Sequence, residues 1–267
     1  MMLSETNDHV ANVRCAEGEH RDDAADHLKR LDRYEDFDQI NGAYLDWQVD
    51  QFRAFVGDRL LEIGCGVGGI LERLPDCSIV QSLDVEESVL RAAQRRFQDR
   101  PEMTFSLLDL ATCEEAQVVE LQAQRFDTVL AINVLEHIED DLTVLQRAER
   151  ILQPGGHMVV LVPAHPRLYG EYDRLDGHFR RYTKSSFRNL IGQTKLDPVR
   201  ISYFNMVGAI GWWWHYRFLK RSIHGATQFG IMNRLIPVLR KLERVVSPPC
   251  GLSVVAVLQK PPVQTND

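Results

Sequence analysis

The sequence predicts an α/β fold built on a mostly parallel, seven-stranded sheet with helices on both faces. From Arg59 onward, short apolar runs alternate with amphipathic segments, a pattern that is typical of strands joined by crossover helices. A chain of 267 residues that is 44% apolar can bury one large core, which favours a single domain with insertions. The seven expected strands cover residues 60–63, 78–83, 104–108, 128–132, 158–162, 199–204 and 252–258.

The segment before the first strand divides into two parts. Residues 1–22 are polar, charged and aperiodic, so we expect a mobile arm there. The single domain then takes up residues 23–267. It begins with a helical lead-in, in which Tyr44, Trp47 and Phe55 recur at roughly helical spacing.

Two of the crossover segments have clear helical patterns. Residues 89–97 and 140–152 carry apolar side chains at helical intervals. Either Asp140 or Asp141 can cap the second helix, and the Pro-Gly-Gly run at 154–156 is expected to end it.

Residues 205–251 lie between the last two strands. They are too many for a hairpin, and too apolar and aromatic for a disordered loop, so they predict a helical insertion that acts as a lid or substrate element. Trp212, Trp213 and Trp214 allow three interpretations: a lid over an apolar substrate, which we favour, contact with a membrane surface, or a homodimer contact.

Composition disfavours several classes of protein. The formal charge of −7 argues against a nucleic-acid partner, because binding to a phosphate backbone depends on clustered Lys and Arg. The five cysteines are scattered and lack metal-site spacing, so we expect no metal site and reduced thiols in the cytoplasm. No apolar run approaches the ~20 residues that span a bilayer, and we expect no secretion signal.

A glycine-rich turn and three carboxylates accompany the first three strands. Residues 64–69 follow the first strand directly, where glycine amides can approach a ligand closely. Glu62 precedes them and suits a cationic ligand better than a pyrophosphate. Asp84 can accept hydrogen bonds from two ribose hydroxyls, and Asp109 can reach an adenine amine. Each acid alone also fits a helix cap, but all three fall at the edge where open α/β sheets bind ligands.

Five motifs in order then resemble those of the class I S-adenosylmethionine-dependent methyltransferases, from about Tyr34 to the end of the chain. They are LLEIGCGVGG (60–69), LDV (83–85), LLDL (107–110), FDTVLAINVLEHIEDD (126–141) and LQPGGHMVVLVPA (152–164). The resemblance implies a Rossmann-like sheet and S-adenosyl-L-methionine as cofactor. Residues 168–187, LYGEYDRLDGHFRRYTKSSF, further resemble a subgroup of bacterial small-molecule methyltransferases associated with glycan or secondary-metabolite pathways.

The resemblance also implies roles for individual residues. Glu62 would hold the glycine loop and sense the methionine end, Asp84 would take the ribose, and Asp109 with the Leu110 amide would take the adenine. Tyr34 or Tyr44 would meet the cofactor carboxylate. The implied cofactor set is Tyr34, Glu62, Gly64, Cys65, Gly66, Gly68, Asp84, Val85, Asp109, Leu110, Asn133 and Val134.

Methyl transfer from a sulfonium is an in-line displacement, so the protein must chiefly align the acceptor and exclude water. His137, just past the fourth strand, is the first choice for general base or substrate positioner, with a structural role as the alternative. His178 is the second candidate, in a loop that also holds Tyr172, Asp173, Arg180, Arg181 and Tyr182. This loop fits either contact with a phosphate or carboxylate on the substrate, or internal ion pairs.

We therefore expect an O- or N-methyltransferase acting on a small molecule, anionic or partly apolar, in glycan-related or secondary-metabolite biosynthesis. One alternative is an NAD-dependent oxidoreductase, since Gly64, Gly66 and Gly69 also fit the dinucleotide-binding pattern. Another is a methyltransferase-like binding module without turnover.

Overall fold

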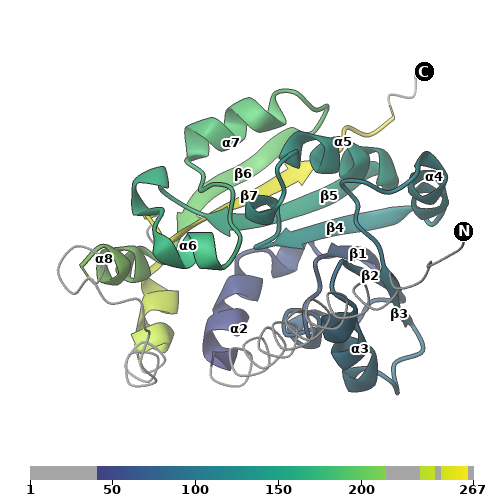
Figure 1. Ribbon diagram of the computed structural model, residues 1–267, viewed down its shortest axis with the longest axis horizontal. Helices are drawn as coiled ribbons and strands as arrows, with labels where there is room; N and C mark the ends of the chain where they lie inside the picture. The colour runs from purple at the N-terminus through teal and green to yellow at the C-terminus, as the bar shows by residue number, and fades with distance from the viewer. Residues whose placement is uncertain (1–40, 215–234, 244–247, 264–267) are drawn as a thin grey trace, which may run out of the picture.

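The computed structural model describes residues 41–214, 235–243 and 248–263 and confirms the predicted sheet. Seven strands lie in the order β3-β2-β1-β4-β5-β7-β6, and only β7 runs antiparallel to its neighbours (Figure 1). The strands are β1 (Arg59–Ile63), β2 (Ile79–Asp84), β3 (Met103–Leu107), β4 (Phe126–Ile132), β5 (Leu152–Pro163), β6 (Asp197–Phe204) and β7 (Ser253–Gln259).

Helices cover both faces of the sheet, as predicted (Figure 1). Leu60 and Leu61 belong to different apolar clusters, because successive side chains of a strand point to opposite faces. One face packs against α4 (Glu115–Ala123), α5 (Asp141–Ile151) and α7 (Lys184–Ile191). The other packs against α2 (Gly42–Asp50), α3 (Glu87–Arg96) and a helix over residues 235–243.

The helix predicted over 140–152 is present, but the Pro-Gly-Gly run does not form the turn that was expected to end it. α5 ends at Ile151, and the Pro-Gly-Gly run lies inside β5. The Gly155 amide donates to the Lys260 carbonyl at 2.9 Å, and the Lys260 amide donates to the Gly156 carbonyl at 3.0 Å. These two bonds extend the sheet, so the glycines continue the strand instead of forming a separate turn. Asp140, one of the two predicted caps, does accept a hydrogen bond from the Thr143 amide.

Two further features concern the insertion and the lead-in. α8 (Met206–Trp214) and the helix over 235–243 make most of the described part of 205–251 helical, as expected. The side chains of Trp212–Trp214, the expected arm at 1–22 and Tyr34 lie outside the described residues. Within the described part of the chain, no helix has both the length and the apolar character that a membrane crossing needs.

Three non-glycine residues with left-handed backbone lie just beyond β4, β5 and β6. They are Asn133 (φ 54°), His165 (φ 60°) and Asn205 (φ 62°). Because these three strands run in the same direction, all three residues fall at the same edge of the sheet. Such conformations cost energy for residues with a side chain and are concentrated at functional sites. A functional site is therefore expected at the edge of the sheet where β4, β5 and β6 end.

Candidate active site

The glycine loop after β1 has the backbone that only glycine adopts freely. Gly64, Gly66 and Gly68 have φ values of 71°, 54° and 84°. A Cβ on Gly64 would lie 2.5 Å from Cγ2 of Val134, which follows β4. The missing side chain thus lets the end of β4 pack directly on the loop after β1.

Asp84, the last residue of β2, is bonded to this loop. Its Oδ2 accepts a hydrogen bond from the Gly66 amide at 2.9 Å, and its Oδ1 accepts one from the Glu86 amide at 3.0 Å. Each carboxylate oxygen has a second lone pair for a ligand. Burial raises the pKa of Asp84, although the backbone hydrogen bonds partly offset this effect.

Glu62 is the most unusual acid of the site. Its side chain is buried in β1, and its Oε2 atom has no hydrogen-bond partner among the described residues. Burial raises its pKa well above the usual value, and the nearby Asp84 carboxylate adds to the shift. Burial raises the pKa of the Cys65 thiol, and the nearby carboxylates of Glu62 and Asp84 raise it further. A cationic ligand at this edge would offset the cost of burying these charges.

Asp109 lies two residues beyond β3 and forms a local cap. Its Oδ1 accepts from the Ala111 amide at 2.8 Å, and its Oδ2 accepts from the Thr112 hydroxyl at 2.9 Å. Leu110, beside it, is buried. The side chain of Val85 is 68% exposed and that of Leu107 is 55% exposed, so the ends of β2 and β3 present apolar surface that suits an aromatic base.

Asn133 and Val134 connect the cofactor edge to the histidines. Asn133 is exposed, and its amide donates to the Leu161 carbonyl at 2.7 Å, which ties the end of β4 to β5. A short 3-10 helix, η3 (Leu135–His137), follows immediately. The structure thus places Gly64, Val134 and His137 along one edge.

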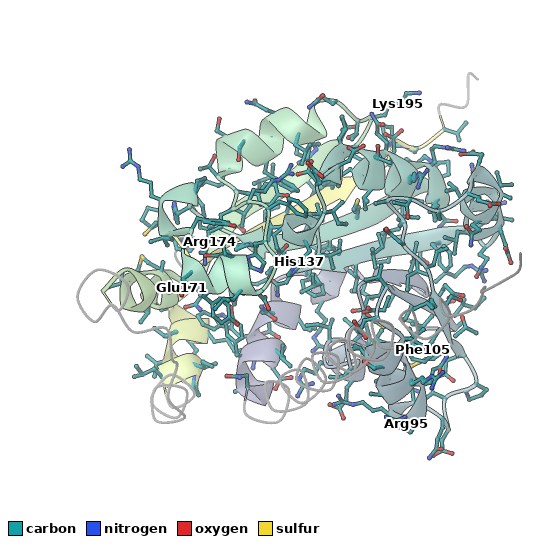
Figure 2. All side chains as sticks on the ribbon, in the orientation of Figure 1. Arg95, Phe105, His137, Glu171, Arg174 and Lys195 are labelled. Carbon is teal, nitrogen blue, oxygen red and sulfur yellow. The ribbon has the colours of Figure 1, made fainter. Side chains whose placement is uncertain are left out.

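His137 and His178 come together from separate segments. Their rings meet edge to face, with centroids 4.6 Å apart and planes at 86°. His137 lies beside the end of α6 (Glu171–Leu175), close to Gly177 (Figure 2). The sequence had predicted a loop where α6 is helical.

The environment of His178 argues against a general base. Its Nδ1 lies 2.9 Å from Asp173 Oδ1, and its Nε2 lies 3.2 Å from Asp176 Oδ2. Burial favours the neutral ring, but the hydrogen bonds to Asp173 and Asp176 outweigh it and raise the pKa to about 9. Carboxylates thus lie against both ring nitrogens, which disfavours His178 as the general base.

The other candidates in this segment pair internally, which was the alternative to substrate contact. The buried Arg181 donates to Asp173 at 2.7 Å, and Arg180 lies 3.2 Å from Asp141. The Tyr182 hydroxyl also donates to Asp141. The ion pairs fix the segment over the edge of the sheet.

Glu136 precedes His137 in η3 and was not singled out in the sequence. Its side chain is 1% exposed, and burial raises its pKa to about 8. Its Oε2 atom has no hydrogen-bond partner within the described parts of the chain. Its position next to His137 was the only signal in the sequence that it belongs to the site.

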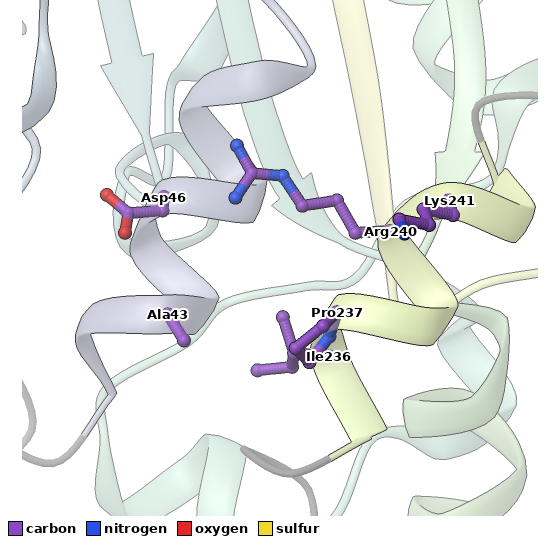
Figure 3. A pocket seen from close by; sticks show the side chains of 6 residues that line it. All are labelled: Ala43, Asp46, Ile236, Pro237, Arg240 and Lys241. Carbon is purple, nitrogen blue, oxygen red and sulfur yellow. The ribbon is translucent and has the colours of Figure 1, made fainter.

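A separate hollow of about 390 Å³ lies between α2 and the helix over 235–243 (Figure 3). It is lined by Ala43, Asp46, Ile236, Pro237, Arg240 and Lys241. Arg240 forms an ion pair with Asp50 of α2, which fastens the insertion to the lead-in helix. Tyr44, which is also in α2, packs against Phe204 at the end of β6.

Comparison with known proteins finds similarity to methyltransferases. Residues 61–158 match the model of a methyltransferase domain. A ubiquinone biosynthesis O-methyltransferase of Vibrio vulnificus is 28% identical over 122 residues, covering 45% of this chain and 50% of that protein. An uncharacterised methyltransferase of Mycobacterium tuberculosis is 34% identical over 110 residues, covering 41% and 52%. The chain thus spans about half the length of the curated relatives it matches.

Solved structures extend the likeness of the fold beyond the matched domain. The N-methyltransferase NodS of Bradyrhizobium japonicum, solved with S-adenosyl-L-homocysteine, is similar with a TM-score of 0.55 and 16% identity, covering 89% of this chain and 97% of NodS. A methyltransferase of Haloferax volcanii in complex with the activator Trm112 gives a TM-score of 0.58 and 16% identity, covering 89% and 99%. Residues 61–158 thus match a methyltransferase domain, and the fold of the whole described chain is similar to those of solved methyltransferases.

Proposed function

We propose that the protein transfers a methyl group from S-adenosylmethionine to an oxygen of a small-molecule acceptor. The observation that carries the proposal is Glu62, a buried acid without a hydrogen-bond partner in the described residues, next to Asp84 and the glycine loop. This group of acids fits a cofactor with a sulfonium and an ammonium group, and it fits the pyrophosphate of a nicotinamide dinucleotide poorly.

In this proposal the cofactor lies across the carboxyl ends of β1 to β4. The Asp84 carboxylate accepts hydrogen bonds from the ribose, and the exposed Val85 contacts the adenine. Asp109 keeps lone pairs for the adenine amine besides its two local bonds. Glu62 offsets the positive charge at the methionine end, near Asn133. The cofactor supplies the electrophilic methyl group when bound.

His137 is the residue that we assign to the acceptor. It follows β4 directly after Asn133 and Val134, on the side of the site away from β2 and β3. There it can accept the acceptor's proton or hold the acceptor in line with the methyl group. His165 and Asn205, which also have left-handed backbone, extend this edge along β5 and β6 to the start of the insertion.

The chemical class of the acceptor follows from the relatives and the insertion. The Vibrio relative is named for O-methylation in ubiquinone biosynthesis, which favours a hydroxyl-bearing, partly apolar acceptor. The Trp-rich insertion suits such a molecule as a lid. Membrane contact or a homodimer through Trp212–Trp214 are the other uses of this segment.

The test has two steps. S-adenosyl-L-homocysteine should bind one per chain in calorimetry and raise the melting temperature. A cell extract incubated with the protein and deuterated S-adenosylmethionine should then contain a metabolite that gains one labelled methyl group. Binding without any labelled product would favour the binding module without turnover, and absence of binding would reject both.

A further inference from the structure

We propose that Glu136, His137 and His178 bind a divalent transition-metal ion at the acceptor side of the site. The carboxylate and imidazole donor atoms of these three residues all lie within 4.8 Å of one another. They come from two segments, η3 after β4 and the turn after α6. The sequence had predicted no metal site, because its cysteines are scattered and lack metal-site spacing.

Glu136 gives an independent reason to expect a ligand. Its side chain is 1% exposed, and its Oε2 atom has no hydrogen-bond partner in the part of the chain that the structure describes. A buried carboxylate oxygen normally has a partner, since leaving it without one is costly. A cation between Glu136 and the two histidines would satisfy this oxygen.

Asp173 holds His178 in the orientation that a metal ligand needs. Its fully buried carboxylate contacts His178 Nδ1 at 2.9 Å and is itself fixed by the Gly170 amide at 2.8 Å and by Arg181 at 2.7 Å. A carboxylate on one ring nitrogen commonly orients the other nitrogen of a histidine toward a metal. Asp173 therefore directs Nε2 away from itself, to the side where Asp176 lies.

Asp176 can complete the site. Its Oδ2 atom is 3.2 Å from His178 Nε2, so a cation bound to that nitrogen would lie next to a second carboxylate. The side chain of Asp176 is 34% exposed and has room to adjust. Two imidazoles and two carboxylates suit Zn²⁺, Mn²⁺ or Fe²⁺ better than Mg²⁺ or Ca²⁺, which prefer oxygen ligands alone.

With a metal ion bound at this site, His137 would position the acceptor. A metal ion held there could bind an acceptor oxygen and keep it near the cofactor, a use that rests on the proposed methyl transfer. Metal binding itself does not depend on that transfer, so the two proposals fail separately.

The experiment measures metal binding by the full chain after removal of bound ions with EDTA. Calorimetry with ZnCl₂ and MnCl₂ should give one ion per chain, and MgCl₂ should bind at least about tenfold more weakly. Glu136→Gln and His178→Gln should each lower affinity at least about tenfold. Asp173→Asn should lower it about 10–100-fold, because it removes the charge that orients His178.

Two controls separate loss of the site from misfolding. His157→Gln changes a histidine of β5 that packs against Phe55, and should leave metal affinity unchanged. Each variant is also titrated with S-adenosyl-L-homocysteine, so a folded protein is recognised by its cofactor binding. The proposal is overturned if wild-type protein binds no Zn²⁺ or Mn²⁺, if Mg²⁺ binds equally well, or if Glu136→Gln binds metal like the wild type while still binding S-adenosyl-L-homocysteine.

Discussion

The Asp84 carboxylate accepts a hydrogen bond from the Gly66 amide at 2.9 Å, which joins the end of β2 to the glycine loop after β1. One oxygen thus orders the loop while the other accepts from Glu86. The acid that we assign to the ribose is therefore held in place before the cofactor arrives, and such preorganisation lowers the entropic cost of binding.

Asp84→Asn should weaken binding of S-adenosyl-L-homocysteine by about 10–100-fold, since hydrogen bonds to a charged group contribute about 1.5–3 kcal/mol. Isothermal calorimetry measures this change. Asp127→Asn is the matched control, because Asp127 likewise accepts backbone amides, from Asp58 and Arg59, but at the opposite edge of the sheet. Equal losses in the two variants would remove Asp84 from the site.

Glu62→Gln should stabilise the cofactor-free protein and weaken cofactor binding. Burial raises the pKa of Glu62 in the folded state, so its ionisation opposes folding. The free energy of unfolding of the wild type is therefore highest below the unfolded-state pKa of Glu62. It decreases as the pH rises from there through the higher folded-state pKa. The gain in melting temperature should therefore be larger at pH 8 than at pH 4.5. A destabilised variant at pH 8 would show that Glu62 has a partner that we have not identified.

Gly64→Ala should destabilise the fold more than Gly155→Ala. Both glycines have positive φ, at 71° and 82°, so both variants incur the backbone penalty of about 1 kcal/mol. Only at Gly64 would the new Cβ also meet Val134, at 2.5 Å, whereas Gly155 has open space around it. Urea denaturation compares the two, and adding Val134→Ala should recover part of the difference. Equal destabilisation would mean that β4 does not pack on the loop.

His137→Gln should lower kcat by about 100-fold or more while leaving affinity for S-adenosyl-L-homocysteine within twofold, if the side chain acts on the acceptor. His157→Gln, in the middle of β5 and paired with Thr128 near the start of β4, should change neither quantity. Single-turnover transfer of a labelled methyl group supplies the rate. A His137 variant with wild-type kcat would leave this histidine a structural role.

The sequence predicted the sheet well because buried strands produce apolar runs that can be recognised without a structure. It failed where pairing with a distant residue decides the outcome. The Pro-Gly-Gly run resembles a helix end, yet Gly155 and Gly156 pair with Lys260, more than a hundred residues away. α4 was not predicted, because its N-cap is Glu114 and not one of the usual capping residues, although the Glu114 amide donates to Oε1 of Gln117.

Part of the candidate site was also predicted from the sequence. Glu62, Asp84 and the glycines stand at strand ends, and their positions follow from the strand pattern. The contacts of His178 do not, because they depend on how the turn at Gly177 folds back onto η3. The burial of Glu136 and the role of Asp173 as the centre of an ion-pair network likewise arise only when the segments after β4 and β5 meet.

The most direct test of the proposed cofactor site is a crystal structure of the protein with S-adenosyl-L-homocysteine. We expect ribose hydroxyls within hydrogen-bond distance of Asp84, with the amino-acid end of the ligand toward Glu62 and Asn133. Ligand density at another edge of the sheet, or an Asp84 carboxylate that makes no contact with the ribose, would contradict it.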